Sequence, residues 1–315
     1  MNAQTTFLSR NCPACGAPAS AAKPNITSGP AAEVMRYSEL VPNWNGFFKD
    51  KVFFSYKRCS NCGMLYAPIF FTPSQLEELY AQMPPNMDIV PVEALRKTQK
   101  GYFDIFKAHS ALTGEYIEIG PDVGLFTENC VREGNFDRYW LFEPNRNVAS
   151  ALVTTMQGRP HEIIPDMFGF STIPDGAASA AVMVHVLDHL LDPVATLRDL
   201  RQKLSPNSHL AIVTHDESSL LSRLFGKRWP AFCLQHPEIY NPRSMRRLLD
   251  TAGFEVLELR KTVNVFPVQF LLRNLLWALG WKVKNVPSFG SMTVGLKLGN
   301  MITIAAPKAA TKDHR

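Results

Sequence analysis

Four of the six cysteines form two pairs with the same spacing, and that spacing suits a metal ion. The pairs are Cys12 and Cys15 in NCPACG, and Cys59 and Cys62 in RCSNCG. Two residues between thiolates let both sulfurs reach one metal from a tight turn, and two such turns make a closed tetrahedral site for structural Zn²⁺. A redox motif or a chance spacing is the alternative, but a thioredoxin-like C-x-x-C would occur once, near a βαβ unit. We therefore predict a structural zinc site.

A glycine turn in YIEIGPDVGLF, residues 116–126, is a second candidate site. Gly120 permits a tight turn after a strand, and Gly124 lets the following helix pack close to that strand. Asp122 stands where a further glycine is usual, and Asp tolerates the left-handed backbone. Its carboxylate, with Glu118 beside the loop, would repel a dinucleotide pyrophosphate but is compatible with the ammonium and sulfonium of S-adenosylmethionine. An ordinary βα turn is the alternative.

Acidic residues follow the next two strand-like runs. Glu143 lies 23 residues beyond Gly120, where a carboxylate at the end of the second strand can accept both ribose hydroxyls. Asp166 follows the third strand and can accept from an adenine amino group, while its apolar neighbour Met167 can pack on the ring. A surface glutamate and a turn aspartate are the structural alternatives.

Helix-like and strand-like runs alternate from about residue 94 onward. The predicted helices are 94–112, 123–133, 147–157, 192–204 and 241–253. The predicted strands are 115–119, 138–143, 161–165, 180–185, 209–215, 254–259 and 299–306. This order predicts an α/β, doubly wound, largely parallel Rossmann-like sheet that binds ligands beyond the carboxyl ends of its strands. Residues 1–93 are predicted to form a small zinc-ribbon-like module with a connector, and 94–315 the main domain.

Composition narrows the choice of partners. The 315 residues are 46% apolar and 19% charged, as in a soluble globular protein, and carry a net charge of +5. That charge is too weak to argue for nucleic acid and is compatible with an anionic small substrate. The N-terminal residues lack the apolar core of a signal peptide, and no run reaches the roughly 18 apolar residues of a membrane span. We therefore expect a cytoplasmic protein.

The ordered motifs resemble those of class I S-adenosylmethionine-dependent methyltransferases over about residues 100–306. They are YIEIGPDVG, LFEPN, VLDHLLDP, LSPNSHLAIVTHD, QHPEIYNPRSMRRLLDTAGFEV and GNMITIAA. The leading cysteine pairs are similar to those of sugar C-methyltransferase relatives. The resemblance implies S-adenosylmethionine as cofactor, held by Glu118, Gly120, Gly124, Glu143 and Asp166, with His185 close to it.

Methyl transfer requires alignment and, for many acceptors, the removal of a proton. Histidine is the natural base near neutral pH, so we consider His236 and His189 as candidates, with Tyr240 orienting the acceptor. His236 lies in a long excursion after the fifth strand, where members of the resembled family cover the substrate. Each histidine could instead be structural. A Cys233 thiol nucleophile beside His236 is disfavoured, because no orienting group or acyl-transfer motif accompanies it.

The apolar segment 265–284 stands between the last two strands. A substrate lid, a homodimer face, an interfacial membrane helix and a helix lying on the core are the alternatives. The function expected overall is methyl transfer to a small polar metabolite, such as a sugar or a nucleotide-linked sugar. An RNA methyltransferase that uses the zinc module as reader, and a non-catalytic scaffold that keeps the fold, are the alternatives.

Overall fold

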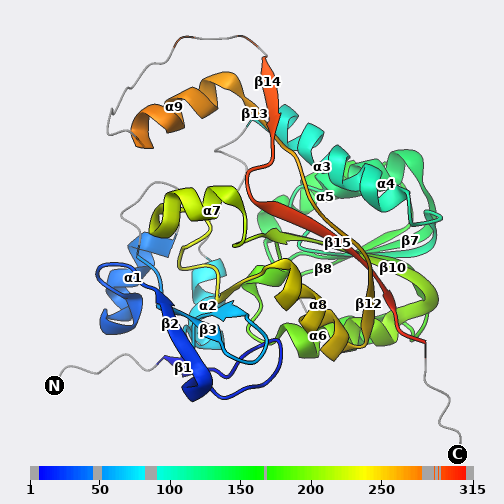
Figure 1. The fold of residues 1–315 in the computed structure, drawn as a ribbon. Coiled ribbons are helices and arrows are strands. Elements are labelled where there is room, and N and C mark those ends of the chain that lie inside the picture. The colour runs from blue at the N-terminus through cyan, green and yellow to red at the C-terminus, as the bar shows by residue number, and fades with distance from the viewer. Residues whose placement is uncertain are drawn as a thin grey trace, which may run out of the picture.

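Seven strands form one central sheet in the computed structural model, which describes residues 7–44, 52–81, 91–166, 169–278, 287, 290 and 292–309. The order is β12-β15-β10-β9-β6-β7-β8 (Figure 1). The strands are β6 (Thr113–Ile119), β7 (Asn135–Phe142), β8 (His161–Ile164), β9 (Ala178–Val184), β10 (Leu204–His215), β12 (Phe254–Lys261) and β15 (Asn300–Pro307). Only β15 among these seven runs against its neighbours. The order reverses between β6 and β9, which is the switch point where such sheets bind ligands.

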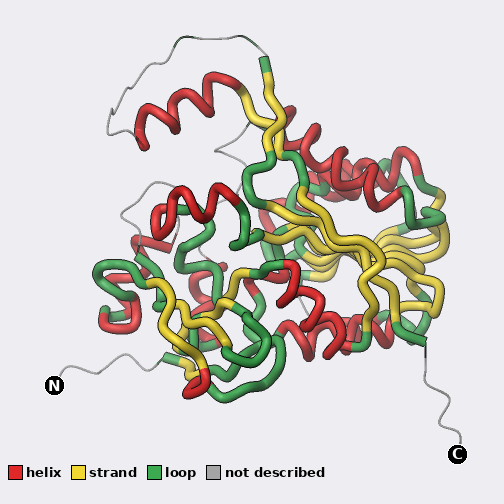
Figure 2. The backbone as a smooth tube through the Cα atoms, in the orientation of Figure 1, coloured by secondary structure: helices red, strands yellow, loops and turns green. Residues whose placement is uncertain are grey.

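Helices cover both faces of the sheet, as predicted (Figure 2). They are α3 (Val92–Lys107), α4 (Leu125–Glu133), α5 (Ala149–Met156), α6 (Pro193–Lys203) and α8 (Pro242–Ala252). Side chains alternate along β6, so Ile117 and Ile119 join the core on the α6 and α8 side, while Tyr116 joins the core under α3, α4 and α5. Both faces are therefore buried, which confirms the predicted doubly wound architecture.

The ends of α8 are set by local hydrogen bonds that the sequence indicates. The Asn241 side chain accepts from the Ser244 backbone, the Ser244 hydroxyl accepts from the Asn241 backbone, and Pro242 begins the helix. Gly253 ends the helix with φ of 88°. These contacts agree with the predicted helix at 241–253, and they fix where the preceding segment enters the helix.

The N-terminal region forms a second, smaller sheet that a distant strand completes. Its order is β11-β4-β3-β2. The small strands are β1 (Leu8–Ser9), β2 (Ala22–Ile26), β3 (Tyr56–Cys59), β4 (Leu65–Tyr66), β5 (Ile69–Phe70) and β11 (Glu238–Ile239), with helices α1 (Tyr37–Trp44) and α2 (Pro73–Ala81) and turns η1 (Ala19–Ala21) and η2 (Ala32–Val34). Because β11 comes from the excursion after β10, residues beyond the predicted boundary at 93 contribute to this sheet.

A buried ion pair reinforces this junction. The Arg10 guanidinium donates to Glu238 Oε2 at 2.7 Å and to the Leu191 carbonyl at 2.8 Å. Both partner side chains are almost fully shielded from solvent. Burial raises the pKa of Glu238 to about 7 even though Arg10 lowers it.

The remaining elements surround the carboxyl edge of the main sheet. They are η4 (Arg146–Val148), η5 (Phe170–Thr172), η6 (Leu187–His189), α7 (Leu220–Phe225), η7 (Gly226–Arg228), β13 (Asn264–Pro267), α9 (Val268–Ala278) and β14 (Thr293–Leu296). The two-stranded antiparallel sheet of β13 and β14 projects from the body of the protein in Figure 1, together with α9, which lies between these strands in the sequence. Helix α9 accounts for part of the apolar segment 265–284, whose residues 279–284 lie outside the described part of the chain.

We expect Arg10→Met to lower the free energy of unfolding at pH 8 by about 3 kcal/mol, because it leaves a buried carboxylate unpaired. The loss should shrink as the pH falls toward 7, because removing Arg10 raises the pKa of Glu238 further and the carboxyl then takes up a proton more readily. The matched control is Arg36→Met, whose ion pair with Glu39 is exposed and should contribute far less to stability. Urea unfolding at several pH values measures both, and equal effects would contradict the buried-pair explanation.

Candidate active site and metal centre

The glycine loop after β6 is a tight turn at the carboxyl edge of the sheet. Gly120, Asp122 and Gly124 all have left-handed φ values, of 66°, 52° and 78°. A Cβ on Gly120 would lie 2.5 Å from Val186 Cγ2, so the loop is packed against the segment that follows β9. A Cβ on Gly124 would lie 3.0 Å from Leu152 Cδ2. The two glycines are thus required sterically, and Asp122 adopts the conformation that its residue type tolerates.

Glu143 lies at the end of β7, beside this loop. Its carboxylate accepts the Asp122 backbone N–H at 2.9 Å and the Asn145 backbone N–H at 2.8 Å. Burial raises the pKa of Glu143, and the Asp122 carboxylate raises it further. Since each carboxylate oxygen can accept more than one hydrogen bond, Glu143 is fixed beside the loop with acceptor capacity left.

Glu118 lies beneath the loop and points into the core. It accepts hydrogen bonds from the Tyr116 hydroxyl at 2.6 Å and from the Thr127 hydroxyl of α4. Burial raises its pKa to about 7 although both hydroxyls lower it. Asp166 is exposed just beyond β8, at the same sheet edge, and Met167 lies outside the described residues.

His185 ends β9 in a left-handed conformation with φ of 54°. Its Nε2 lies 3.1 Å from the Asn300 side-chain amide nitrogen, which can donate to it. Its Nδ1 is buried and has no hydrogen-bond partner in the described part of the chain. Burial lowers the pKa of His185 to about 3, so this imidazole is neutral.

Four imidazoles gather around one buried carboxylate at this edge, and we name them the histidine cluster: His185, His189, His215 and His236, with Asp188. The ring centroids of His185 and His215 are 4.8 Å apart, those of His215 and His236 4.9 Å, and those of His189 and His236 4.7 Å. Four elements of sequence therefore converge: the end of β9, η6, the end of β10 and the excursion that carries His236.

The closest pair in this cluster is Asp188 and His215. Asp188 Oδ2 lies 2.6 Å from His215 Nδ1, and the carboxylate is inaccessible to solvent whereas the ring is 25% exposed. Burial by itself raises the pKa of Asp188, but the hydrogen bond and charge of His215 hold it well below its usual range. From the sequence alone, His215 is identified only as the end of a predicted strand. One feature of the sequence could have identified the pair: Asp188 follows one strand and His215 ends the next, and these two strands, β9 and β10, pair in the sheet.

The catalytic candidates from the sequence have other contacts. His236 Nδ1 lies 2.7 Å from the Ala231 carbonyl and 3.4 Å from Cys233 Sγ. His189 Nδ1 lies 3.0 Å from the Tyr80 hydroxyl of α2. The structure thus brings both histidines into the cluster. Tyr240 is fully buried, and its hydroxyl lies 3.4 Å from the Leu187 carbonyl and 3.4 Å from Glu238, so it holds η6 and β11 together.

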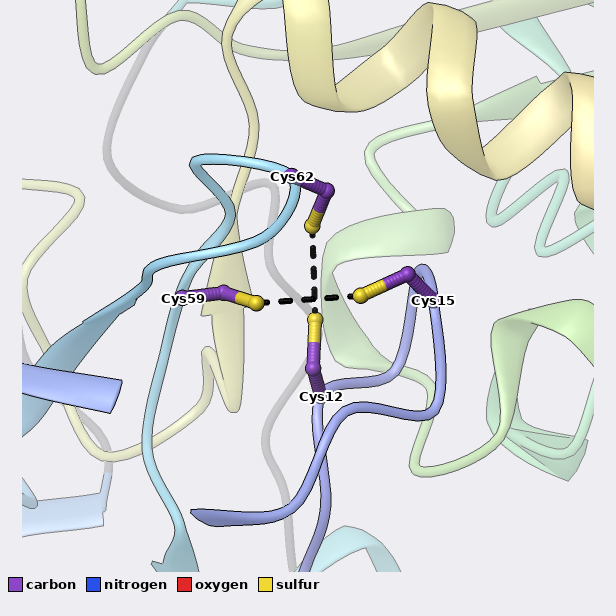
Figure 3. Close-up of side chains that lie close together, drawn as sticks. All are labelled: Cys12, Cys15, Cys59 and Cys62. Carbon is purple, nitrogen blue, oxygen red and sulfur yellow. Dashed lines mark hydrogen bonds between the residues drawn. The ribbon is translucent and has the colours of Figure 1, made fainter. Parts of the chain in front are cut away.

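The four paired cysteines converge on one point, as Figure 3 shows. Cys12 Sγ and Cys62 Sγ are 3.5 Å apart, and Cys15 Sγ and Cys59 Sγ are 3.7 Å apart. All four sulfurs lie within 4.8 Å of one another. Tetrahedral Zn²⁺ with Zn–S bonds of about 2.3 Å requires sulfur separations of about 3.8 Å, so the set has the size of a zinc site.

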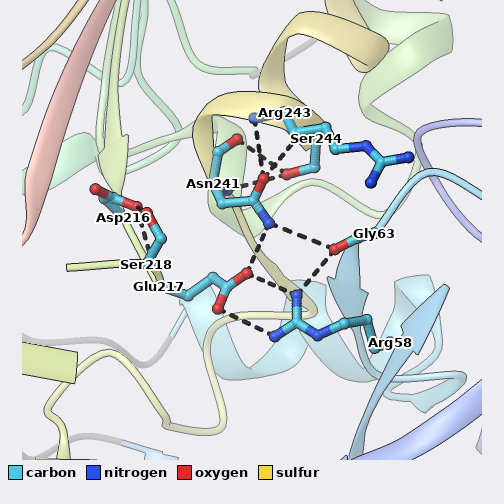
Figure 4. Close-up of polar contacts among 8 residues, drawn as sticks. All are labelled: Arg58, Gly63, Asp216, Glu217, Ser218, Asn241, Arg243 and Ser244. Atoms are coloured by element: carbon cyan, nitrogen blue, oxygen red, sulfur yellow. Dashed lines mark hydrogen bonds and ion pairs between the residues drawn. The ribbon is translucent and has the colours of Figure 1, made fainter. Parts of the chain in front are cut away.

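A polar network connects the second cysteine turn to the main domain (Figure 4). Arg58 donates to the Gly63 carbonyl at 2.9 Å and to Glu217 Oε1 at 2.8 Å. The Asn241 amide also donates to Glu217 Oε1, at 2.7 Å. These bonds hold Gly63, Glu217 and Asn241 together. The second cysteine turn is therefore connected to the segment after β10 and to the start of α8.

Two surface cavities, of about 360 and 680 Å³, lie at the opposite sheet edge. They are lined by residues such as Arg246, His209 and Lys308, near the amino ends of the parallel strands. Doubly wound sheets bind ligands at the carboxyl edge, so we place the candidate site at the glycine loop and histidine cluster instead. Within the described residues, no helix has the length and apolar character needed to cross a membrane.

Comparison with known proteins agrees with this geometry. Residues 94–259, just over half of the chain, match the family model described as a methyltransferase domain. No curated protein matches the sequence.

Solved structures share the fold. The 1,6-didemethyltoxoflavin-N1-methyltransferase of Burkholderia thailandensis, with bound 1,6-didemethyltoxoflavin and S-adenosylhomocysteine, is 12% identical with a TM-score of 0.53, over 79% of this chain and 98% of that one. A chain from the complex of the Haloferax volcanii Trm112 methyltransferase activator with a methyltransferase is 10% identical with a TM-score of 0.51, over 69% of this chain and 92% of that one. At these identities the likeness is one of fold alone.

We expect Glu118→Gln to remove a pH dependence of stability. The native pKa of about 7 exceeds the ordinary value of 4.5, so the folded protein binds this proton more tightly than the unfolded chain does. The stabilisation is complete below about pH 4.5 and is lost as pH rises to 7, a change on the order of 3 kcal/mol. Urea unfolding between pH 5 and 8 should therefore show a flatter profile for the variant, whose amide oxygen can still accept from Tyr116 and Thr127. An unchanged slope would contradict the assignment.

Proposed function

Because the chain belongs to the methyltransferase-domain family and is an S-adenosylmethionine-dependent methyltransferase, we propose that it methylates a small polar acceptor bound at the histidine cluster. A sugar or a nucleotide-linked sugar is the acceptor class we favour. The observation that carries this proposal is the contact between Gly120 and Val186, since Val186 lies between His185 and Asp188. A methyl donor on the glycine loop would thus be adjacent to the imidazoles.

The charges around the glycine loop fit a cationic donor. Burial is the main cause that raises the pKa of Glu118, Asp122 and Glu143. None of the three makes an ion pair with a residue that the structure describes. A bound sulfonium and ammonium would supply the missing positive charge, whereas a pyrophosphate would add to the repulsion. Asp122 is therefore compatible with the binding of S-adenosylmethionine at this loop.

We assign the donor's ribose to Glu143 and its methionine portion to the loop around Gly120 and Gly124. When bound, S-adenosylmethionine supplies an electrophilic methyl group on sulfur. Asp166 and Met167 remain our candidates for the adenine, and His185 for a neighbour of the donor. The chain's own contribution is to orient the acceptor and remove its proton.

We propose a small acceptor because the imidazoles that would contact it lie close together at the sheet edge, each with its ring centroid within 4.9 Å of another. The net charge of +5 gives little support to RNA as the acceptor. The convergence of four imidazoles from separate elements argues against a non-catalytic scaffold, because it is not required by the fold.

We also propose that Cys12, Cys15, Cys59 and Cys62 bind one structural Zn²⁺. Their sulfur separations of 3.5 and 3.7 Å support this. Four thiolates leave no open coordination position, so the ion would fold the module and not act on substrate. Through Arg58, Glu217 and Asn241 the same ion would steady the segment after β10.

The first experiment is calorimetric titration with S-adenosylmethionine. We expect binding by the native protein, and a dissociation constant about 10- to 100-fold higher for Glu143→Gln, because a hydrogen bond to a charged group is lost. The control is Asp137→Asn, an exposed acid at the other end of β7. A screen of sugars and nucleotide-linked sugars for release of S-adenosylhomocysteine then tests the acceptor class. Equal affinities of the two variants would contradict the role of Glu143.

We expect one zinc ion per chain by elemental analysis of the purified protein. Cys15→Ser should reduce the zinc content severalfold and lower the melting temperature, because metal binding contributes to folding. Cys233→Ser is the control, since Cys233 lies outside the four-sulfur set, and its zinc content should not change. Full zinc occupancy in Cys15→Ser would contradict the four-thiolate site.

A further inference from the structure

We propose that His215, positioned by Asp188, is the general base of the reaction, and that the methyl acceptor is a hydroxyl group. This inference rests on the proposed function and names its acid–base residue and acceptor chemistry. It concerns a pair of residues that the sequence did not single out for catalysis.

The geometry of the pair fixes the tautomer of the imidazole. A carboxylate oxygen 2.6 Å from His215 Nδ1 is an acceptor, so Nδ1 carries the hydrogen and Nε2 holds the lone pair. The carboxylate is wholly buried while the ring is 25% exposed. His215 is therefore anchored through Nδ1 and partly accessible to solvent, and a base that must meet an acceptor needs both properties.

The other three rings are less suited to take a proton. Burial lowers the pKa of both His185 and His189 to about 3, so they are poor bases. Burial also lowers the pKa of His236, but the charge and hydrogen bond of Cys233 raise it to about 10, which favours the imidazolium. Among the four rings, only His215 has a hydrogen bond to a carboxylate within the described structure.

The position of the pair suits transfer from the glycine loop. His215 ends β10, and Asp188 follows β9, the strand that pairs with both β10 and β6. Gly120, which ends β6, packs on Val186, only two residues before Asp188. The base and the donor loop therefore belong to adjacent strand ends of one rigid sheet.

The proton and charge balance is complete without a further reactant. His215 Nε2 takes the hydroxyl proton while the acceptor oxygen bonds to the methyl carbon and the carbon–sulfur bond breaks. The sulfonium charge disappears as neutral S-adenosylhomocysteine forms, and a positive charge appears on the imidazolium beside Asp188. Water then removes the proton. A hydroxyl acceptor needs such a base because its pKa is far above neutrality.

Several charged or titratable groups face His215 and will shape its pH dependence. They are Asp188 of η6, His185 at the end of β9, His189 of η6, and His236 with its neighbour Cys233 from the excursion. Asp188 stabilises the imidazolium that forms when His215 takes a proton, so Asp188→Asn should lower kcat.

The first test needs no acceptor. In the full-length zinc-loaded protein with S-adenosylhomocysteine, ¹⁵N-histidine NMR should identify His215 as the Nδ1–H tautomer, and Asp188→Asn should shift the ring toward the Nε2–H tautomer. An Nε2–H tautomer in the native protein, or a tautomer that does not respond to Asp188→Asn, would overturn the proposal. If Asp188→Asn does not fold, the tautomer in the native protein decides.

The second test is catalytic, with the best hydroxyl acceptor from the screen. We expect His215→Gln to lower kcat on the order of 100-fold or more, with little change in S-adenosylmethionine affinity. His209→Gln, six residues earlier on β10, is the control and should keep full activity. Imidazole should restore part of the activity of His215→Ala, which a merely structural histidine would not allow. Loss of donor binding in all variants would instead point to failure of the proposed function.

A metal ion is the outcome that would replace this mechanism. His185, Asp188 and His215 have ligand atoms within 4.8 Å of one another. Elemental analysis that finds a second metal ion per chain, lost in His215→Gln and required for activity, would overturn the general-base role. One zinc per chain in both proteins supports it.

Discussion

The site depends on one junction, where the excursion after β10 is bound to the N-terminal module. The pairing of β11 with β4 and the buried contact between Arg10 and Glu238 hold this excursion in place. Only Pro237 separates His236 from β11, so the pairing of β11 also restricts the position of His236. The Tyr56 hydroxyl donates to the His236 carbonyl at 2.6 Å. The module therefore forms a wall of the proposed acceptor site, and the proposed zinc ion would support that wall without any chemistry of its own.

Electrostatics divides the site into two halves. The half around the glycine loop is rich in buried carboxyls that lack a cation, whereas the half around Asp188 is rich in neutral imidazoles. A cationic donor suits the first half, and an acceptor that must lose a proton suits the second. The reaction would transfer one positive charge from the acidic half to the imidazole half. The carboxyls around the glycine loop would stabilise the sulfonium before the step, and Asp188 would stabilise the imidazolium after it.

Much of the fold could be predicted from the sequence because its signals are local. The helix at α6, the Asn241 cap of α8 and the glycine turn each arise within a dozen residues, and the structure has the two helices with ends that differ by a few residues from those predicted. The pairing of β11 could not be predicted, since two residues carry no periodicity and their partner strand lies about 170 residues earlier. Likewise, His215 and Asp188 are 27 residues apart, and only the parallel pairing of β9 and β10 brings them together. Glu118 is next to the loop in sequence, and its buried contact with Tyr116 follows from the alternation of side chains along β6.

The late position of β11 also has a consequence for biosynthesis. The N-terminal module is made first, but its sheet lacks an edge strand until residue 239 has left the ribosome. Until then the edge of β4 is unpaired, and the rings of Phe53 and Tyr56 lack their contacts with Phe232. An unpaired strand edge with exposed aromatic rings is prone to aggregation. We therefore expect that the zinc ion we propose would protect the nascent module if it were bound before the main domain is made.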